Sequence, residues 1–170
     1  FEELGADAVT LSPYMGKDSI EPYLKYDNKW SVILGLTSNK GSEDFQQQEL
    51  SDGGKLYENV IRNSASWGTV SNTMFVTGAT QASHLESIRE IIPNHFLLVP
   101  GVGTQGGSLA DVSNAALTRE CGLLVNVSRG IIYASNGVDF SAKARSVATD
   151  YQKQMERILE QAEVIEEGGY

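Results

Sequence analysis

The stretch VPGVGTQGG (99–107) contains Gly101, Gly103 and Gly106 at the spacing G-x-G-x-x-G. Glycines at this spacing let a backbone turn approach phosphate oxygens closely, as in the dinucleotide-binding folds. The spacing alone is a weak signal, because the chain has 17 glycines and the pattern can recur by chance. The strands and helices on either side of the stretch must therefore decide which fold it belongs to.

Five short apolar stretches are predicted to be strands. Their apolar residues are continuous rather than alternating, which is typical of parallel strands that are covered on both faces. Predicted helices follow the second, third and fourth of them, and this alternation favours βαβ units in an α/β fold. The expected strands are 6–12, 31–38, 73–79, 95–102 and 122–128, and the expected helices are 47–67, 83–92 and 108–121.

A last amphipathic segment is predicted to be one closing helix over about 141–167, with Val147, Tyr151, Met155 and Ile158 near helical spacing. The whole chain, 1–170, is interpreted as one domain, because its length and its 41% hydrophobic composition suffice for a single core.

Two architectures fit the alternation of strands and helices. In a dinucleotide-binding sheet the glycine motif belongs to the first strand-helix turn, whereas here it follows the fourth strand. Arg129, after the fifth strand, could hold a 2′-phosphate, so an NADP-binding domain stays open. In a (β/α)₈ barrel the phosphate site is built from the loops after strands 7 and 8. If the last two strands here are those strands, the glycine loop and the forked guanidinium of Arg129 are explained together.

Composition and charge exclude several classes of function. Lysine plus arginine number 13 and aspartate plus glutamate 22, and the net charge of −9 disfavours binding to nucleic acid or to an anionic membrane surface. Cys121 is the single cysteine, and with two histidines a metal cluster is not expected. No apolar run approaches the ~20 residues of a membrane span. These observations favour a cytoplasmic protein, and the opening at Phe1 reads as the interior of a longer sequence.

The chain resembles the orotidine 5′-monophosphate decarboxylases, in particular the bacterial branch with a PYMG motif. The matching segments span nearly the whole chain in order, and their combination is highly specific. They are GADAVTLSPYMGKDSIEP (5–22), ILGLTSNKGSEDFQ (33–46), VTGAT (76–80), LLVPGVGTQGG (97–107) and VNVSRGIIYAS (125–135).

The resemblance implies a TIM barrel that converts orotidine 5′-monophosphate (OMP) to UMP and CO₂ in pyrimidine synthesis. It implies a homodimer without cofactor or metal. The phosphate contacts it assigns are Gln105 and Arg129, with backbone groups near Gly103 and Ser128.

For the rest of the substrate, the resemblance assigns Ser38, with Thr37 as the neighbouring possibility, to the pyrimidine ring. Pro100 and Val102 are assigned to an apolar pocket beside the leaving carboxylate.

One family feature is absent from the chain. The family's catalytic array, Asp-x-Lys-x-x-Asp at the end of the third strand, occurs nowhere between Phe1 and Tyr170. We therefore expect the five strands to be strands 4 to 8 of the barrel, the array to lie upstream of Phe1, and the chain alone not to turn over. Two alternatives stay open: another phosphate-binding barrel enzyme, such as an isomerase or aldolase, and an inactive nucleotide-binding fragment.

Overall fold

A computed structural model describes residues 1–51, 53–78, 82–103 and 107–165. Its centre is a parallel sheet of five strands in the spatial order β1-β2-β3-β4-β5. The strands are β1 (Ala8–Leu11), β2 (Trp30–Leu36), β3 (Thr73–Thr77), β4 (Phe96–Pro100) and β5 (Leu123–Asn126). Each predicted strand is therefore confirmed, with its carboxyl end one or two residues earlier than expected.

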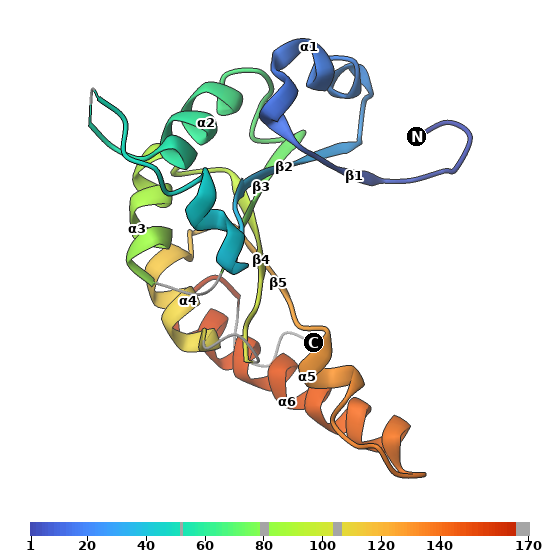
Figure 1. Cartoon of the computed structure of the whole chain (residues 1–170). Coiled ribbons are helices and arrows are strands. Elements are labelled where there is room, and N and C mark those ends of the chain that lie inside the picture. The colour runs from blue at the N-terminus through green and yellow to red at the C-terminus, as the bar shows by residue number, and fades with distance from the viewer. Residues whose placement is uncertain (52, 79–81, 104–106, 166–170) are drawn as a thin grey trace.

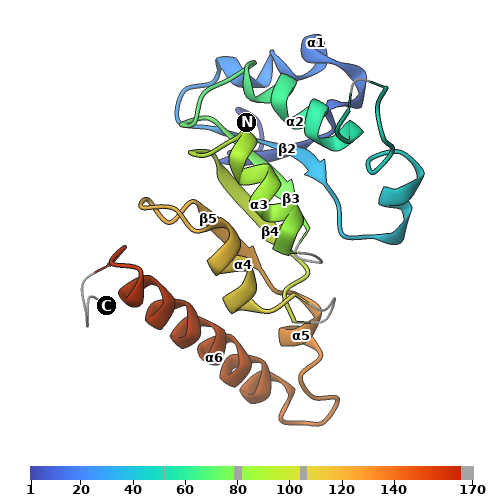
Figure 2. The ribbon, with the colours of Figure 1, turned by 90° about the vertical axis from the view of Figure 1, so that its left-hand side faces the viewer.

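The order of the strands decides between the two architectures. A doubly wound sheet reverses its strand order at a switch point, whereas neighbours in a barrel follow one another along the chain. Figures 1 and 2 show α2 (Leu56–Ala65), α3 (Ala82–Ile91) and α4 (Leu109–Ala116) along one face of the sheet. The chain thus has the fold of part of a (β/α)₈ barrel, and the dinucleotide-binding sheet is excluded.

The remaining helices are short, except for the last. The first strand is followed by the 3-10 helix η1 (Pro13–Met15), by α1 (Lys17–Ile20) and by η2 (Tyr23–Lys25), none of which was predicted. After β5 come α5 (Arg129–Ile132) and α6 (Phe140–Gln161), and α6 packs beside α4 and α5 (Figure 2).

The helix expected over 47–67 is wrong in its first half, because α2 begins only at Leu56. Gly53 and Gly54 have φ values of +89° and +79°, and the Leu50 N–H donates to the Gly54 carbonyl at 3.0 Å. This turn is preceded by η3 (Lys40–Asp44). Two adjacent glycines in the left-handed region reverse the chain, so a helix cannot run through them.

Two other helices end earlier than predicted. The helix expected over 108–121 stops at Ala116, because Thr118 and Cys121 exchange two backbone hydrogen bonds of 3.0 Å in a turn. The closing helix ends at Gln161 instead of 167, because Glu163 adopts a φ of +56°, which is incompatible with a continuing right-handed helix.

The sheet has two unequal faces. Beneath the helices lies the main core, in which Ile33, Phe75 and Leu97 are fully buried against Ile61 and Leu85. The opposite face, which in a closed barrel is the interior, carries a smaller cluster of Val32, Met74 and Val76 with half-buried neighbours, and Leu124 there is 52% exposed. Among the described helices, none combines the length and the apolar character that crossing a membrane requires.

Candidate functional site

A cavity of about 150 Å³ lies at the carboxyl ends of β2, β4 and β5. Its walls come from three separate segments of the sequence, each at or just after the carboxyl end of a strand. The lining residues are Ser38, Pro100, Gly101, Val102, Asn126, Ser128 and Arg129. The structure thus brings together Ser38, Pro100, Val102, Ser128 and Arg129, which sequence reasoning had placed at one site.

The register of the sheet explains why these segments meet. Pro100 pairs with Asn126, so β4 and β5 end side by side and their loops leave the same edge. Gly101 turns the chain away at a φ of +96°, a conformation that glycine adopts without steric cost. Val102 then returns into the main core and is 2% exposed, which anchors the start of the glycine loop.

Asn126 is a cavity residue that the sequence analysis missed. Its Oδ1 accepts a hydrogen bond from the Ser128 hydroxyl at 3.0 Å. Asn126 is the last residue of β5, so a polar residue near the carboxyl end of a predicted strand was a usable signal.

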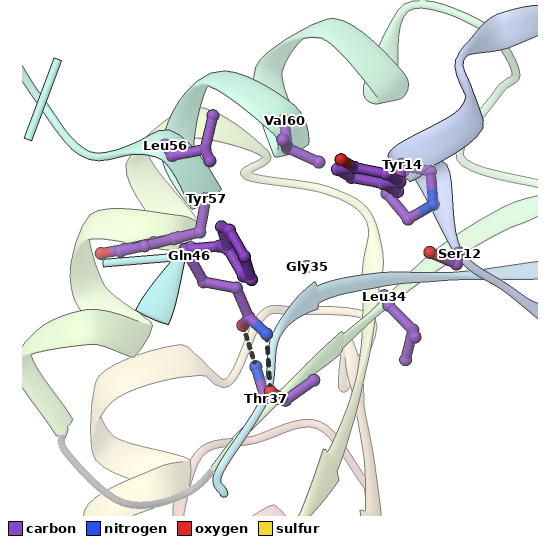
Figure 3. Close-up of a pocket in the computed structure, with 11 residues that line it drawn as sticks. Ser12, Tyr14, Leu34, Gly35, Thr37, Gln46, Leu56, Tyr57 and Val60 are labelled. Atoms are coloured by element: carbon purple, nitrogen blue, oxygen red, sulfur yellow. Dashed lines mark hydrogen bonds between the residues drawn. The ribbon is translucent and has the colours of Figure 1, made fainter. Parts of the chain in front are cut away.

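Thr37 lies outside this cavity and faces a second one of about 260 Å³, shown in Figure 3. Its backbone N–H donates to the Gln46 Oε1, and its hydroxyl accepts from the Gln46 Nε2, both at 2.8 Å. The same hydroxyl donates to the Asn39 Oδ1 at 2.6 Å. Of the two candidates for the pyrimidine contact, Ser38 is therefore the one that shares a cavity with Arg129.

The second cavity is mainly apolar and lies between the loop after β1 and the start of α2. Tyr57 is one of its lining residues, and burial, together with the neighbouring Glu58 carboxylate, raises the pKa of this phenol to about 12. The Tyr57 hydroxyl donates to the Glu58 Oε1 at 3.2 Å, so it remains protonated at neutral pH.

The two remaining predicted residues belong to the glycine loop. Gly103 donates its N–H to the Gly107 carbonyl at 2.9 Å, and a side-chain carbon added at Gly103 would collide with the Tyr151 hydroxyl of α6. Gln105 lies outside the described residues, as do the last two residues of the VTGAT segment, Ala79 and Thr80.

Arg129 is the one formal charge among the residues lining the first cavity. Within the described part of the chain, no carboxylate forms an ion pair with it, so its guanidinium can bind an anion. Nor do the described residues hold a cluster of three or more His, Cys, Asp or Glu side chains suited to a metal ion. The cavity therefore combines one cation, small hydroxyls and an apolar wall.

The profile of the Orotidine 5′-phosphate decarboxylase / HUMPS family matches residues 1–144. The chain belongs to this family.

Named relatives agree with this membership of the decarboxylase family. The orotidine 5′-phosphate decarboxylase of Porphyromonas gingivalis is 57% identical over 159 residues, and that of Phocaeicola vulgatus is 52% identical over 159 residues. Each match covers 94% of this chain and 58% of the relative. The solved OMP decarboxylase of Leishmania donovani is 38% identical with a TM-score of 0.72, over 86% of this chain and 56% of that one. The chain thus spans less than two thirds of these decarboxylases.

The first cavity has one cationic group for an anion but holds few groups for catalysis. A guanidinium fork fits a pair of phosphate oxygens, and Pro100 offers a surface without a hydrogen-bonding side chain. Val102 also lines the cavity, but only 2% of this residue is exposed. Neither lysine nor carboxylate is among the described residues that line it. The cavity thus has groups suited to binding and orienting an anion, whereas proton transfer to carbon requires another group.

Proposed function

We propose that the protein carrying this chain is an orotidine 5′-phosphate decarboxylase, which converts OMP to UMP and CO₂ in pyrimidine synthesis. The observation that carries the proposal is the first cavity, where Ser38, Pro100 and Arg129 meet from three separate loops. The 57% identity to a decarboxylase of that name supports the same substrate.

In this proposal each end of the nucleotide has its own contacts. Arg129 binds the phosphate, together with Gln105 and with backbone groups near Gly103 and Ser128. Ser38 contacts the pyrimidine ring at the other end.

Pro100 and Val102 lie beside the carboxylate that leaves. An apolar wall there disfavours the charged ground state, which is relieved when CO₂ forms.

The phosphate grip contributes to catalysis indirectly. Loss of CO₂ leaves negative charge at C6 of the ring, and remote binding energy helps only by holding that carbon in a preorganised electrostatic site. We propose that the lysine that protonates C6 belongs to an Asp-x-Lys-x-x-Asp array N-terminal to Phe1, and that β1 to β5 are strands 4 to 8 of the barrel. The enzyme works as a cytoplasmic homodimer without cofactor or metal.

The test is a decarboxylation assay on the natural gene product, with Arg129→Ala as the decisive variant. We expect OMP to be decarboxylated and the variant to raise KM roughly a hundredfold, because two charge-assisted hydrogen bonds to the phosphate are lost. UMP should protect the wild type against thermal unfolding, and sugar phosphates should not be turned over. Turnover of a sugar phosphate, with none of OMP, would instead identify an isomerase or aldolase.

A further inference from the structure

The segment after β2 is tied back to the end of that strand by one side chain. The chain leaves the sheet at Leu36, passes Thr37 and Ser38, runs through η3 and returns at Gln46 in front of α2. Both polar atoms of the Gln46 amide are used by Thr37, one on its N–H and one on its hydroxyl, at 2.8 Å each (Figure 3). These two hydrogen bonds close a ring between residues nine positions apart.

Ser38 is held from its other side by the β3 end. The Gly78 N–H donates to the Leu36 carbonyl at 2.8 Å, and a side-chain carbon at Gly78 would lie 2.8 Å from the backbone nitrogen of Ser38. The Ser38 backbone therefore lies between a glycine that packs directly on it and a Thr37 whose N–H and hydroxyl are both engaged.

The neighbouring glutamines show that this role is specific to Gln46. Gln47 donates to the Ser42 hydroxyl at 3.2 Å, and Gln48 donates to the Asp44 carbonyl at 2.7 Å, so both bond within their own turn. Among the three, Gln46 alone bonds to the strand end from which Ser38 projects, as far as the described contacts show.

We infer that Gln46 is a positioning residue for pyrimidine recognition: through Thr37 it fixes the Ser38 hydroxyl in the cavity that contains Arg129. Gln46 itself lines the second cavity and is not among the residues of the first. A contact of this kind must be held to about 0.5 Å, so a loop that drifts loses the ring contact while the distant phosphate grip persists. The inference rests on the proposed function.

The test compares two ligands that share a phosphate but differ in the base. UMP and ribose 5-phosphate are titrated by calorimetry into the full-length gene product and its variants. Gln46→Ala should weaken UMP about tenfold, as expected for two lost hydrogen bonds, and ribose 5-phosphate less than about twofold. Gln48→Ala, which removes the exposed neighbour, should change neither affinity.

Two further arms separate positioning from general stability. In a Ser38→Ala background Gln46→Ala should cause no additional loss of UMP affinity, because the group it positions is already gone. Thr37→Ser, which keeps the hydroxyl, should bind UMP like the wild type, whereas Thr37→Val should lose about fivefold. If Gln46→Ala does not fold, the comparison of Thr37→Ser with Thr37→Val tests the positioning role instead.

Equal losses for both ligands, or full additivity with Ser38→Ala, would overturn the inference and leave the proposed function intact. A wild type that binds UMP no better than ribose 5-phosphate and does not decarboxylate OMP would overturn the proposed function, and the inference with it.

Discussion

Arg89 is a half-buried residue whose guanidinium joins the two turns at the amino-terminal ends of β4 and β5. It donates hydrogen bonds of 2.8 to 3.3 Å to the carbonyl oxygens of five residues, and burial lowers its pKa to about 10. The acceptors are Ala116, Ile92, Pro93, His95 and Gly122. The fork therefore fixes the α3–β4 and α4–β5 connections at once.

We expect Arg89→Met to lower the free energy of unfolding by about 2–4 kcal/mol, because several partly buried carbonyl oxygens lose their donors. Arg89→Lys should recover only part of the loss, since an ammonium cannot reproduce the planar fork. Arg62→Met, at an exposed position of α2, should change the stability by less than about 0.5 kcal/mol. Urea unfolding monitored by circular dichroism measures all three. Wild-type stability in Arg89→Lys would show that charge alone suffices.

His95 makes the fold sensitive to acid. Its ring packs edge-on against Phe75 with 5.6 Å between ring centres, and neither ring nitrogen has a hydrogen-bond partner among the described residues. Burial, and secondly the charge of Arg89, lower its pKa below the usual 6.5. Below about pH 6.5 His95 binds a proton in the unfolded chain but stays neutral in the folded chain. The free energy of unfolding therefore falls as the pH falls.

We expect the free energy of unfolding to decrease from pH 7.5 toward pH 5, by at most roughly 1.4 kcal/mol per pH unit for this one group. His95→Phe should flatten that slope. His84, whose pKa is lowered mainly by burial, is present in both proteins and cancels in the difference. Urea titrations at several pH values provide the measurement, and an unchanged slope in His95→Phe would assign the acid sensitivity elsewhere.

At the scale of elements, Gly103 of the glycine loop lies against Tyr151 of α6. Gly103 has a φ of +85°, and a carbon added there would meet the Tyr151 hydroxyl of α6. Gly103→Ala should therefore destabilise the protein by about 1–3 kcal/mol and raise the KM for OMP, because alanine is strained at this φ and its Cβ collides with the Tyr151 hydroxyl. Gly5→Ala, at a φ of +62° with nothing within 4 Å, should cost only the backbone term of about 1 kcal/mol and leave KM unchanged.

The double variant Gly103→Ala/Tyr151→Phe separates the two causes. Removing the hydroxyl should relieve the collision and restore part of the KM, while the strain of the positive φ remains. Thermal unfolding and steady-state kinetics are measured on the same samples. A KM that does not respond to Tyr151→Phe would show that the collision with α6 does not cause the loss of binding.

The elements that could be predicted from the sequence are those with a local signal. The apolar runs of β2 and β4 are continuous. The distinctive residues LTSN begin at the end of β2, and PGVG begins at the end of β4. Local signals also existed where the prediction failed, since the glycines at 53 and 54 break the expected helix. The tie between Gln46 and Thr37 has no such signal, because it joins residues whose meeting depends on the path of a whole loop.

At the scale of the whole molecule, the sheet has two open edges and one open face. β1 and β5 each pair with a single neighbour, and Leu124 on the open face is 52% exposed. A parallel sheet is normally covered on both faces, and unpaired edges invite further strands. The chain also spans 58% of the Porphyromonas gingivalis relative. These features match the proposal that β1 to β5 are the later strands of a barrel.

That proposal predicts complementation between two separate chains. Expressed alone, residues 1–170 should form concentration-dependent oligomers in sedimentation velocity and show no decarboxylation, because the described cavity has an anion grip but no lysine. Co-expressed with the amino-terminal part of the Porphyromonas gingivalis relative, which would supply the missing strands and the lysine array, they should form a heterodimer that decarboxylates OMP.

Leu124→Asp should abolish this rescue, because it puts a charge into the closed barrel. Val138→Asp, at a fully exposed residue before α6, should leave it intact. Rescue that survives Leu124→Asp would mean that the open face is not where the other strands pack, and activity of residues 1–170 alone would place the proton donor within them.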